Sequence, residues 1–223
     1  MLKALIFDFD GLILDTETPE VDTWTRIYAE HGYDFPFEEW AQTVGGYGIS
    51  SFDAAEHLSL LSQGRLNPVI LRDRHRLESS AVIERASILP GVMDMIRAAK
   101  QHGLKMAIAS SSRHAWVDGH TRRLGIFHLF DHIICADDVG DGKTKPNPDL
   151  FLLALNRLQV QKNEAVIFED SPNGVLAAKR AGVFVVAVIN PLTARLKVEG
   201  ANLTVTSLAE LSFPTLLNAL QLA

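Results

Sequence analysis

The sequence has almost no cysteine. Only one cysteine, Cys135, occurs among 223 residues, so a disulfide framework within the chain is excluded. A chain of this length buries roughly 70% of its unfolded surface and does not need such cross-links. Because Cys135 lies in a short apolar run, we expect it to be a small buried side chain rather than a reactive thiol.

The chain also lacks an excess of positive charge. It has 21 Lys and Arg against 27 Asp and Glu, which gives a formal net charge of −6. A general nucleic-acid or anionic-membrane binder needs a basic face, so neither partner is expected. A small phosphorylated ligand needs only a local positive pocket and is compatible with this composition.

Long hydrophobic runs are missing as well. The longest clear run covers residues 182–189, well short of the ~20 apolar residues that span a membrane. Asp8 interrupts the first apolar segment, so no secretory signal is predicted. We therefore expect a cytoplasmic protein, and we expect a monomer because nothing in the sequence demands an oligomer.

Several well-known ligand motifs are absent. Gly142-Lys143-Thr144 matches the end of a P-loop, but Asp137 occupies the position of the earlier glycine. No GxGxxG motif follows a strand, and the eight histidines show no metal-binding spacing. His114 and His120 are expected on a solvated helix surface.

Short apolar strands alternate with helical segments through most of the chain. Asn147-Pro148 and Ser171-Pro172 mark two helix starts, each a cap residue followed by proline. This alternation predicts an α/β protein with a Rossmann-like parallel sheet. The predicted strands cover residues 4–7, 105–109, 132–136, 165–168 and 184–189.

One region breaks the alternation. Residues 17–85 show no strand pattern, and helices are predicted at 20–30, 37–44, 51–61 and 68–83. We therefore predict two domains. Residues 1–15 and 87–223 would form the α/β core, and residues 16–86 would form a small inserted helical cap.

Polar side chains follow four of the predicted strands. In open α/β sheets ligands bind beyond the carboxyl ends of the strands, so these side chains are expected to converge. Two unpartnered acids at one strand end would cost several kcal/mol, which indicates that something stabilises them. The converging residues are Asp8 and Asp10, then Ser110, Ser111 and Ser112, then Lys145, and finally Glu169 and Asp170.

A hard divalent cation would hold such carboxylates together. Mg²⁺ prefers oxygen ligands and is commonly bound through one or two carboxylates plus a substrate phosphate. Asp8 and Asp170 are the expected side-chain ligands, and Glu169 is either a further ligand or a partner of one. Lys145 would offset the remaining negative charge and contact a phosphate oxygen.

Small donors near these acids could bind the phosphate itself. Ser110 and the backbone amides of Ser111 and Ser112 follow the second strand. The amides after Asp8, in the turn through Phe9 and Gly11, could cradle the same anion.

Four motifs occur in order along the chain: DFDGLILDTE at 8–17, AIASSS at 107–112, KP at 145–146 and FEDSPNG at 168–174. Together with the insert after the first motif, they resemble the haloacid dehalogenase superfamily. The resemblance covers the whole chain. It is greatest to the subgroup with a helical cap between the first two motifs, which includes β-phosphoglucomutase and small sugar-phosphate phosphatases.

The resemblance implies a mechanism. Asp8 would attack phosphorus and form an aspartyl-phosphate. Asp10 would protonate the leaving oxygen, then activate the hydrolytic water, and its backbone carbonyl would bind Mg²⁺. This implies a Mg²⁺-dependent phosphatase of a small phosphomonoester, most naturally a sugar phosphate.

Specificity is expected to lie in the cap. Its glycine-rich segment makes Tyr47 a candidate contact for substrate. Arg72 and Arg76 are further candidates, although the mixed charges of residues 72–78 favour a solvated helix face.

Two alternatives stay open. A β-phosphoglucomutase-like mutase would carry an arginine near Tyr47 and a histidine at position 20, where this chain has glutamate, so a phosphatase is favoured. A protein that binds a phosphorylated ligand without turnover is the other alternative.

Overall fold

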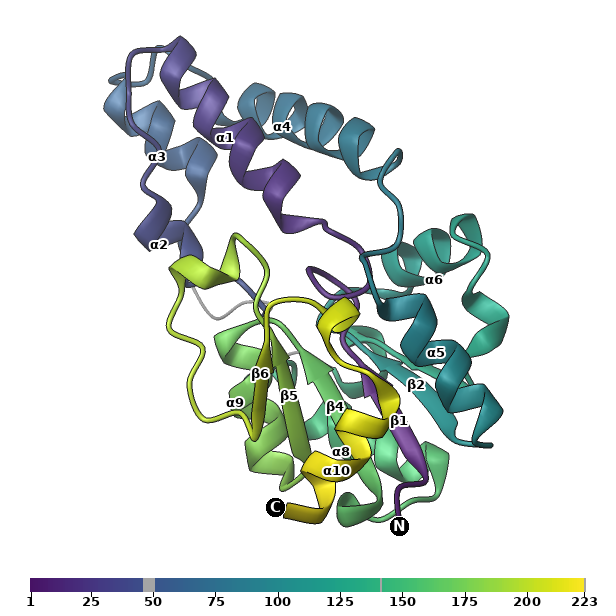
Figure 1. Ribbon diagram of the computed structural model, residues 1–223. Coiled ribbons are helices and arrows are strands. Elements are labelled where there is room, and N and C mark those ends of the chain that lie inside the picture. The colour runs from purple at the N-terminus through teal and green to yellow at the C-terminus, as the bar shows by residue number, and fades with distance from the viewer. Residues whose placement is uncertain (46–50, 141, 223) are drawn as a thin grey trace.

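The computed structural model describes residues 1–45, 51–140 and 142–222. Within them the chain forms a parallel sheet in the order β3-β2-β1-β4-β5-β6, flanked by helices, with the helices of residues 17–83 set apart beyond the carboxyl ends of the strands (Figure 1). The fold class predicted from the sequence is confirmed. The strands are β1 (Ala4–Phe7), β2 (Lys105–Ala109), β3 (His132–Ile134), β4 (Ala165–Glu169), β5 (Phe184–Val188) and β6 (Leu203–Val205).

Strand β1 lies at the centre of the sheet and shows how both faces are covered. Leu5 and Phe7 face a core formed with α5 (Val92–Gln101), α6 (His114–Arg123) and α10 (Phe213–Leu222). Ala4 and Ile6 face the opposite core, formed with α8 (Asp149–Leu158) and α9 (Pro172–Ala181). Successive residues of a strand point to opposite faces, so an unbroken apolar run is what a doubly covered strand requires.

The connections include a short helix, α7 (Ala136–Val139), and four 3-10 turns. The predicted strand 132–136 ends two residues early, because Cys135 caps α7 instead of continuing β3. Cys135 is fully buried, as expected.

Asn147 is not the cap of α8: Pro148 takes that position, and the Asn147 side chain donates to the carbonyl of Gly142. The 3-10 turns are η1 (Phe127–Leu129), η2 (Lys162–Glu164), η3 (Thr193–Arg195) and η4 (Leu208–Glu210).

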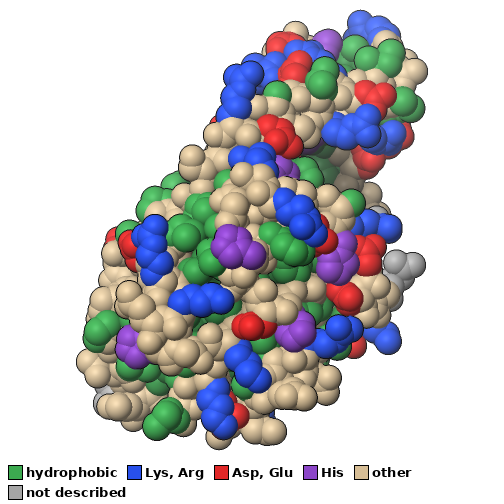
Figure 2. Space-filling model, turned by 90° about the vertical axis from the view of Figure 1, so that its right-hand side faces the viewer, with side chains coloured by type: hydrophobic (Ala, Val, Ile, Leu, Met, Phe, Trp, Pro, Cys, Tyr) green, Lys and Arg blue, Asp and Glu red, His purple; other side chains and the backbone are tan. Residues whose placement is uncertain are grey.

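The segment after β1 is helical, as predicted: α1 (Glu17–Glu30), α2 (Phe37–Ala41), α3 (Ala54–Leu61) and α4 (Pro68–Ile83). These helices bury an apolar cluster of their own around Ile27, Tyr28 and Leu58. Figure 2 shows them as the smaller upper lobe, where Lys and Arg side chains are interspersed with Asp and Glu. The boundaries 16 and 86 of a separate cap domain stay a prediction.

No helix in the described ranges combines the length and the apolar character that crossing a bilayer would require.

Candidate active site

The carboxyl ends of β1, β2 and β4 meet at the edge of the sheet that faces α1 and α2. A cavity of about 300 Å³ lies there between the sheet and the helical lobe. Its wall on the sheet side is formed by Asp8, Asp10, Ser110, Ser111, Ser112 and Trp116, and its wall on the helical side by Thr16, Glu17, Glu20, Trp40, Thr43, Val44 and Gly45.

Lys145 is buried beneath Asp8. Its Nζ donates a hydrogen bond to Asp8 Oδ1 and another, of 2.5 Å, to Glu169 Oε1. Burial alone would lower the pKa of Lys145, but the charges of Asp8 and Glu169 outweigh it and hold the pKa above its usual value. Burial raises the pKa of Asp8, and the positive charge of Lys145 opposes that rise. The ammonium group therefore compensates part of the negative charge that the strand ends concentrate.

Glu169 has partners on both oxygens. Its Oε2 accepts hydrogen bonds from the amides of Asp170 (3.0 Å) and Ser171 (3.1 Å) and from the Ser171 hydroxyl (3.0 Å). These donors belong to the N-terminus of α9, where unpaired amides and the helix dipole favour a carboxylate. A Cβ at Gly174 would lie 1.9 Å from the carboxyl carbon of Glu169, so this close packing requires glycine. Glu169 is thus fixed between Lys145 and the helix.

Only one of the two carboxylate oxygens of Asp170 has a hydrogen-bond partner among the described residues. Its Oδ2 accepts a 3.0 Å hydrogen bond from Asn190 Nδ2, which also donates to the carbonyl of Gly11 at 3.1 Å. Its Oδ1 is buried and has no hydrogen-bond partner among the residues that the structure describes. Burial, and then the charges of Glu17 and Glu169, hold the pKa of Asp170 well above its usual value. An ionised Asp170 therefore needs a further positive partner.

Asp8, Glu169 and Asp170 each offer an oxygen within 4.8 Å of the others. A compact group of carboxylate oxygens, one of them without a partner within the described ranges, fits a hard divalent cation. Gly11 is part of this packing: it has φ +75°, and a Cβ there would lie 2.2 Å from Asp170 Oδ2. The residues present therefore fit a magnesium ion.

Asp10 is held by four side-chain donors. Its Oδ1 accepts from Thr16 Oγ1 (3.0 Å) and Trp116 Nε1 (2.8 Å). Its Oδ2 accepts from Ser110 Oγ (3.1 Å) and Ser112 Oγ (2.7 Å). The carboxylate is therefore fixed in orientation on the cavity wall, beside Asp8.

The remaining predicted residues lie in different places. Phe9 is fully buried and its ring stacks on His120, so only its backbone could contact a ligand. Arg72 pairs with two acids of the helical lobe, and Arg76 pairs with Asp73 at 3.0 Å, so neither lines the cavity. Tyr47 lies outside the described residues. The partners of Arg72 are Asp53 (2.9 Å) and Glu56 (2.5 Å).

Sequence reasoning missed several side chains at this site. Trp116, in the first turn of α6, reaches Asp10, and Asn190, after β5, reaches Asp170. His120 was expected at the surface but is buried against Phe9 and Trp116. The periodicity of α6 could have placed Trp116 and His120 on one face, four residues apart. The other missed residues are Thr16, Glu17, Glu20 and Trp40.

Comparison with known proteins identifies the family. A model described as haloacid dehalogenase-like hydrolase matches residues 2–182. The chain belongs to this family. The "Putative phosphatase YhcW" of Bacillus subtilis (strain 168) is 42% identical to it over 220 residues, which cover 99% of this chain and 98% of that protein. The fructose-1-phosphate phosphatase YqaB of Escherichia coli (strain K12) is 32% identical over 187 residues, covering 83% of this chain and 95% of that protein.

Solved structures agree on the fold. The crystal structure of β-phosphoglucomutase from Clostridium difficile superposes with a TM-score of 0.73, covering 99% of this chain and 98% of that chain, at 24% identity. At this identity the likeness shows the fold alone. The predicted superfamily, fold class and hydrolase class of this chain are confirmed by these matches.

Proposed function

We propose that this protein is a Mg²⁺-dependent phosphatase that hydrolyses small phosphomonoesters, sugar phosphates in particular, through an aspartyl-phosphate on Asp8. The observation that carries the proposal is the placement of Asp8: its carboxylate lines the cavity while Lys145 pairs with it from below. The names of two relatives, one a phosphatase of a sugar phosphate, favour the same reaction.

The metal-holding groups in this proposal are the carboxylates of Asp8 and Asp170 and the backbone carbonyl of Asp10. Magnesium, when bound, would neutralise part of the charge of the phosphoryl group and of the carboxylates around it. Glu169 already has partners on both oxygens, so its role is to fix Lys145 and the start of α9.

The chain's own residues carry the proposed chemistry. The step starts with Asp10 protonated, which requires one of its accepted hydrogen bonds to be given up. An oxygen of Asp8 then attacks phosphorus and the bond between phosphorus and the ester oxygen breaks, while Asp10 gives its proton to the leaving oxygen. Asp10 then takes a proton from a water molecule that attacks the phosphorus, which releases inorganic phosphate and regenerates Asp8. The four donors to Asp10 position its carboxylate, and one of their hydrogen bonds must be exchanged when the ester enters.

Donors on the sheet side complete the proposed phosphate site. Ser110, Ser111 and Ser112 line the same wall as Asp8. The hydroxyls of Ser110 and Ser112 donate to Asp10 and that of Ser111 donates to the carbonyl of Gly45, so each must exchange its partner to bind a phosphate oxygen. Lys145 compensates negative charge from below, and positioning together with charge neutralisation supplies most of the catalysis of phosphoryl transfer.

A mutase is the alternative within this fold, and the cavity gives it no support. A mutase must hold a second phosphate on the helical side, where the described lining contains no Lys, Arg or His. Interconversion of glucose 1-phosphate and glucose 6-phosphate, stimulated by a bisphosphate, would favour the mutase.

Phosphate release from a panel of phosphomonoesters tests the proposal. We expect turnover with Mg²⁺, loss of turnover on chelation, and a loss of at least a thousandfold in Asp8→Asn. Asp10→Asn should also lose turnover while it still binds phosphate. Asp22→Asn, an exposed acid on α1, is the matched control and should retain the wild-type rate. Full activity of Asp8→Asn, or no hydrolysis of any ester, would contradict the proposal.

A further inference from the structure

Two buried carboxylate oxygens at one end of the cavity lack partners. Among the residues that the structure describes, Glu17 Oε2 and Asp170 Oδ1 are the buried side-chain polar atoms without a hydrogen bond. The Glu17 side chain lines the cavity, but this one of its oxygens is shielded from solvent. A buried acceptor without a donor loses its hydration and gains nothing in return. Such an atom in a native fold indicates a partner from outside the chain, a water molecule or an ion.

The two carboxylates face the same small space beside Gly11. A Cβ at Gly11 would lie 2.2 Å from Asp170 Oδ2 and 3.3 Å from Glu17 Oε2. The positive φ of Gly11 (+75°) favours glycine, and the lack of a side chain leaves room for both acids. Asn190 closes one side of this space by donating to the Gly11 carbonyl and to Asp170 Oδ2. Glu17 therefore lies at the end of the cavity that would hold the metal.

The surroundings of Glu17 are negatively charged. Burial holds the pKa of Glu17 well above its usual value, and the charges of Asp10 and Asp8 add to the rise. After burial, the charge of Glu17 is the largest cause of the raised pKa of Asp170. None of the described residues that line the cavity is Lys, Arg or His. A cation beside the two acids would relieve their repulsion and favour their ionised forms.

Glu17 stands outside the set of direct ligands. Asp8, Glu169 and Asp170 offer oxygens within 4.8 Å of one another, and Glu17 is not a member of that group. Mg²⁺ loses its hydration reluctantly and usually keeps several water molecules. A carboxylate one water molecule away from the ion accepts a hydrogen bond from that water. Outer groups of this kind typically change metal affinity about 10- to 100-fold.

Glu17 comes from the helical lobe, unlike the acids on the sheet side. It is the first residue of α1, whereas Asp8 follows β1 and Asp170 follows β4. The first turn of a helix favours a negative side chain, because its free amides and its dipole are positive there. The position therefore suits a carboxylate that faces a cation.

We infer that Glu17 is an outer residue of the magnesium site: its carboxylate accepts a hydrogen bond from a water molecule that the ion retains, and it thereby raises the affinity for magnesium. The site would then take one group from the helical lobe as well as its ligands from the sheet side. The inference rests on the proposed magnesium-dependent function, and it gives Glu17 no part in the transfer of the phosphoryl group.

Calorimetric titration with magnesium, without substrate and at constant ionic strength, tests the inference. Glu17→Gln keeps the size of the side chain and removes its charge, and we expect it to raise the dissociation constant of magnesium about tenfold. Glu20→Gln removes a charge from the same turn of α1 and the same cavity, and it should change the constant less than threefold. A rise of less than fivefold in Glu17→Gln, or an equal rise in both variants, would overturn the inference.

Manganese in place of magnesium separates the outer role from direct coordination. The relaxation rate of solvent protons reports how many exchanging water molecules the bound manganese carries. Wild type and Glu17→Gln should give the same number when all the manganese is bound, because Glu17 holds a water molecule and does not replace one. One additional water molecule in the variant would make Glu17 a direct ligand and would contradict the inference.

Melting temperatures separate a metal-binding role of Glu17 from a purely structural one. Without metal, Glu17→Gln should melt no lower than wild type, because it removes a buried charge that repels Asp170. With magnesium at one fixed concentration, its melting temperature should rise less than that of wild type. A lower melting temperature without metal, together with an unchanged rise on adding magnesium, would mean that Glu17 only supports the fold and would refute the inference.

None of these measurements uses a substrate, so the two proposals can fail separately. An unchanged magnesium affinity in Glu17→Gln would refute the role of Glu17 even if the protein hydrolyses phosphomonoesters. Weaker magnesium binding in Glu17→Gln would support that role even if no ester is hydrolysed and the proposed function is wrong.

Discussion

At the scale of single residues, Lys145 is the group on which the site depends most. It is about 1% exposed and is paired with two buried carboxylates, Asp8 and Glu169. Replacing a whole buried ion pair by apolar groups can be neutral, but removing one partner leaves an uncompensated charge and costs about 3–5 kcal/mol. The ammonium group of Lys145 therefore compensates buried negative charge at the ends of both β1 and β4.

Lys145→Met keeps the length of the side chain and removes its charge. We expect the free energy of unfolding to fall by about 3 kcal/mol or more, measured by urea denaturation without magnesium. Lys143→Met, at an exposed lysine two residues earlier, should change stability by less than about 0.5 kcal/mol. Equal stability of Lys145→Met and wild type would mean that the acids are stabilised by something other than this ammonium group.

The sequence predicted the charged residues of the site that follow strands. Asp8, Lys145 and Asp170 come directly after, or shortly after, apolar runs whose ends must meet at one edge of a parallel sheet. Glu17 and Trp116 belong to helices, and the rotation of a helix about its axis is set by the packing of the whole molecule. Their approach to the cavity was therefore not visible in the local pattern.

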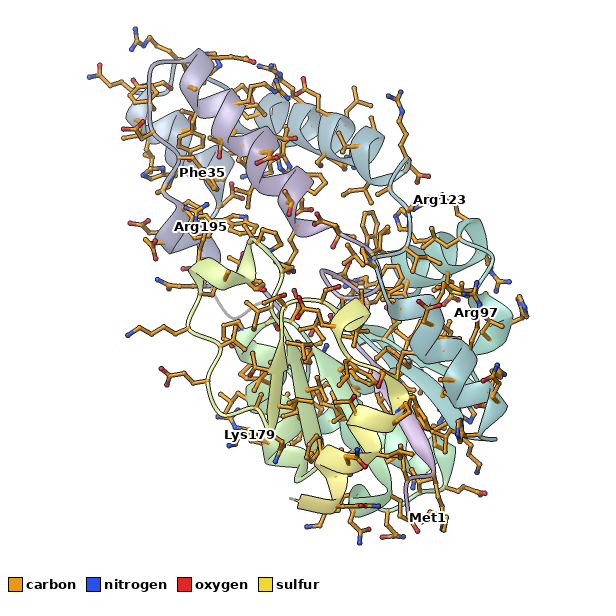
Figure 3. The ribbon with its side chains drawn as sticks, viewed as in Figure 1. Met1, Phe35, Arg97, Arg123, Lys179 and Arg195 are labelled. Atoms are coloured by element: carbon orange, nitrogen blue, oxygen red, sulfur yellow. The ribbon has the colours of Figure 1, made fainter. Side chains whose placement is uncertain are left out.

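At the scale of elements, the segment after β5 joins the two sides of the site. Asn190 binds Asp170 and Gly11, and Leu192 packs among the apolar side chains of α1 and α2. The guanidinium carbon of Arg195, in η3, lies 3.4 Å from the ring centroid of Phe37, and Figure 3 shows Arg195 beside α2. Asn173, at the start of α9, adds a 2.8 Å hydrogen bond to the carbonyl of Val44. These contacts hold the end of α2 over the cavity.

Arg195→Ala should loosen that contact without touching the reacting groups. An exposed cation–π pair is worth about 0.5–1 kcal/mol, so we expect KM for a phosphomonoester to rise about two- to fivefold with little change in kcat. Initial-rate kinetics would measure both constants. Lys197→Ala removes an exposed positive charge two residues away and should leave KM unchanged. A similar change in both variants would point to general electrostatics instead of the contact with Phe37.

Elements were predicted from sequence where the apolar pattern was long enough. Strands β1 to β5 and the helices of the inserted segment were found with boundary errors of a few residues. Strand β6 was missed because the exposed Thr204 separates its two partly buried apolar residues, whereas β3 (His132–Ile134), an edge strand of the same length, has its two isoleucines adjacent in one continuous run. Helix α10 was missed as well, although its apolar face completes the core beside β1.

At the scale of the whole molecule, folding concentrates negative charge at one edge of the sheet. Asp8, Glu169 and Asp170 converge there, and one oxygen of Asp170 has no partner in the described part of the chain. A cation that binds only the folded state stabilises it by mass action. The stability of the entire chain should therefore report on metal binding independently of activity.

We expect magnesium at about 100 times its dissociation constant to stabilise the fold by about 2.7 kcal/mol. For a chain of this size that corresponds to a rise in melting temperature of about 5–10 °C, measured by calorimetry. Sodium chloride at equal ionic strength should not reproduce the shift. Asp170→Ala should lose most of it, whereas Asp22→Asn should keep it. A full shift in Asp170→Ala would place the cation elsewhere.

The most direct measurement of the central claim is the fate of the phosphoryl group during a single turnover. The protein would be mixed with a phosphomonoester carrying a labelled phosphoryl group, quenched in acid within milliseconds and digested for mass spectrometry. The account predicts label on the peptide that contains Asp8, rising and then decaying as phosphate is released, and none in Asp8→Asn. Phosphate release without a labelled intermediate, or label on another side chain, would contradict it.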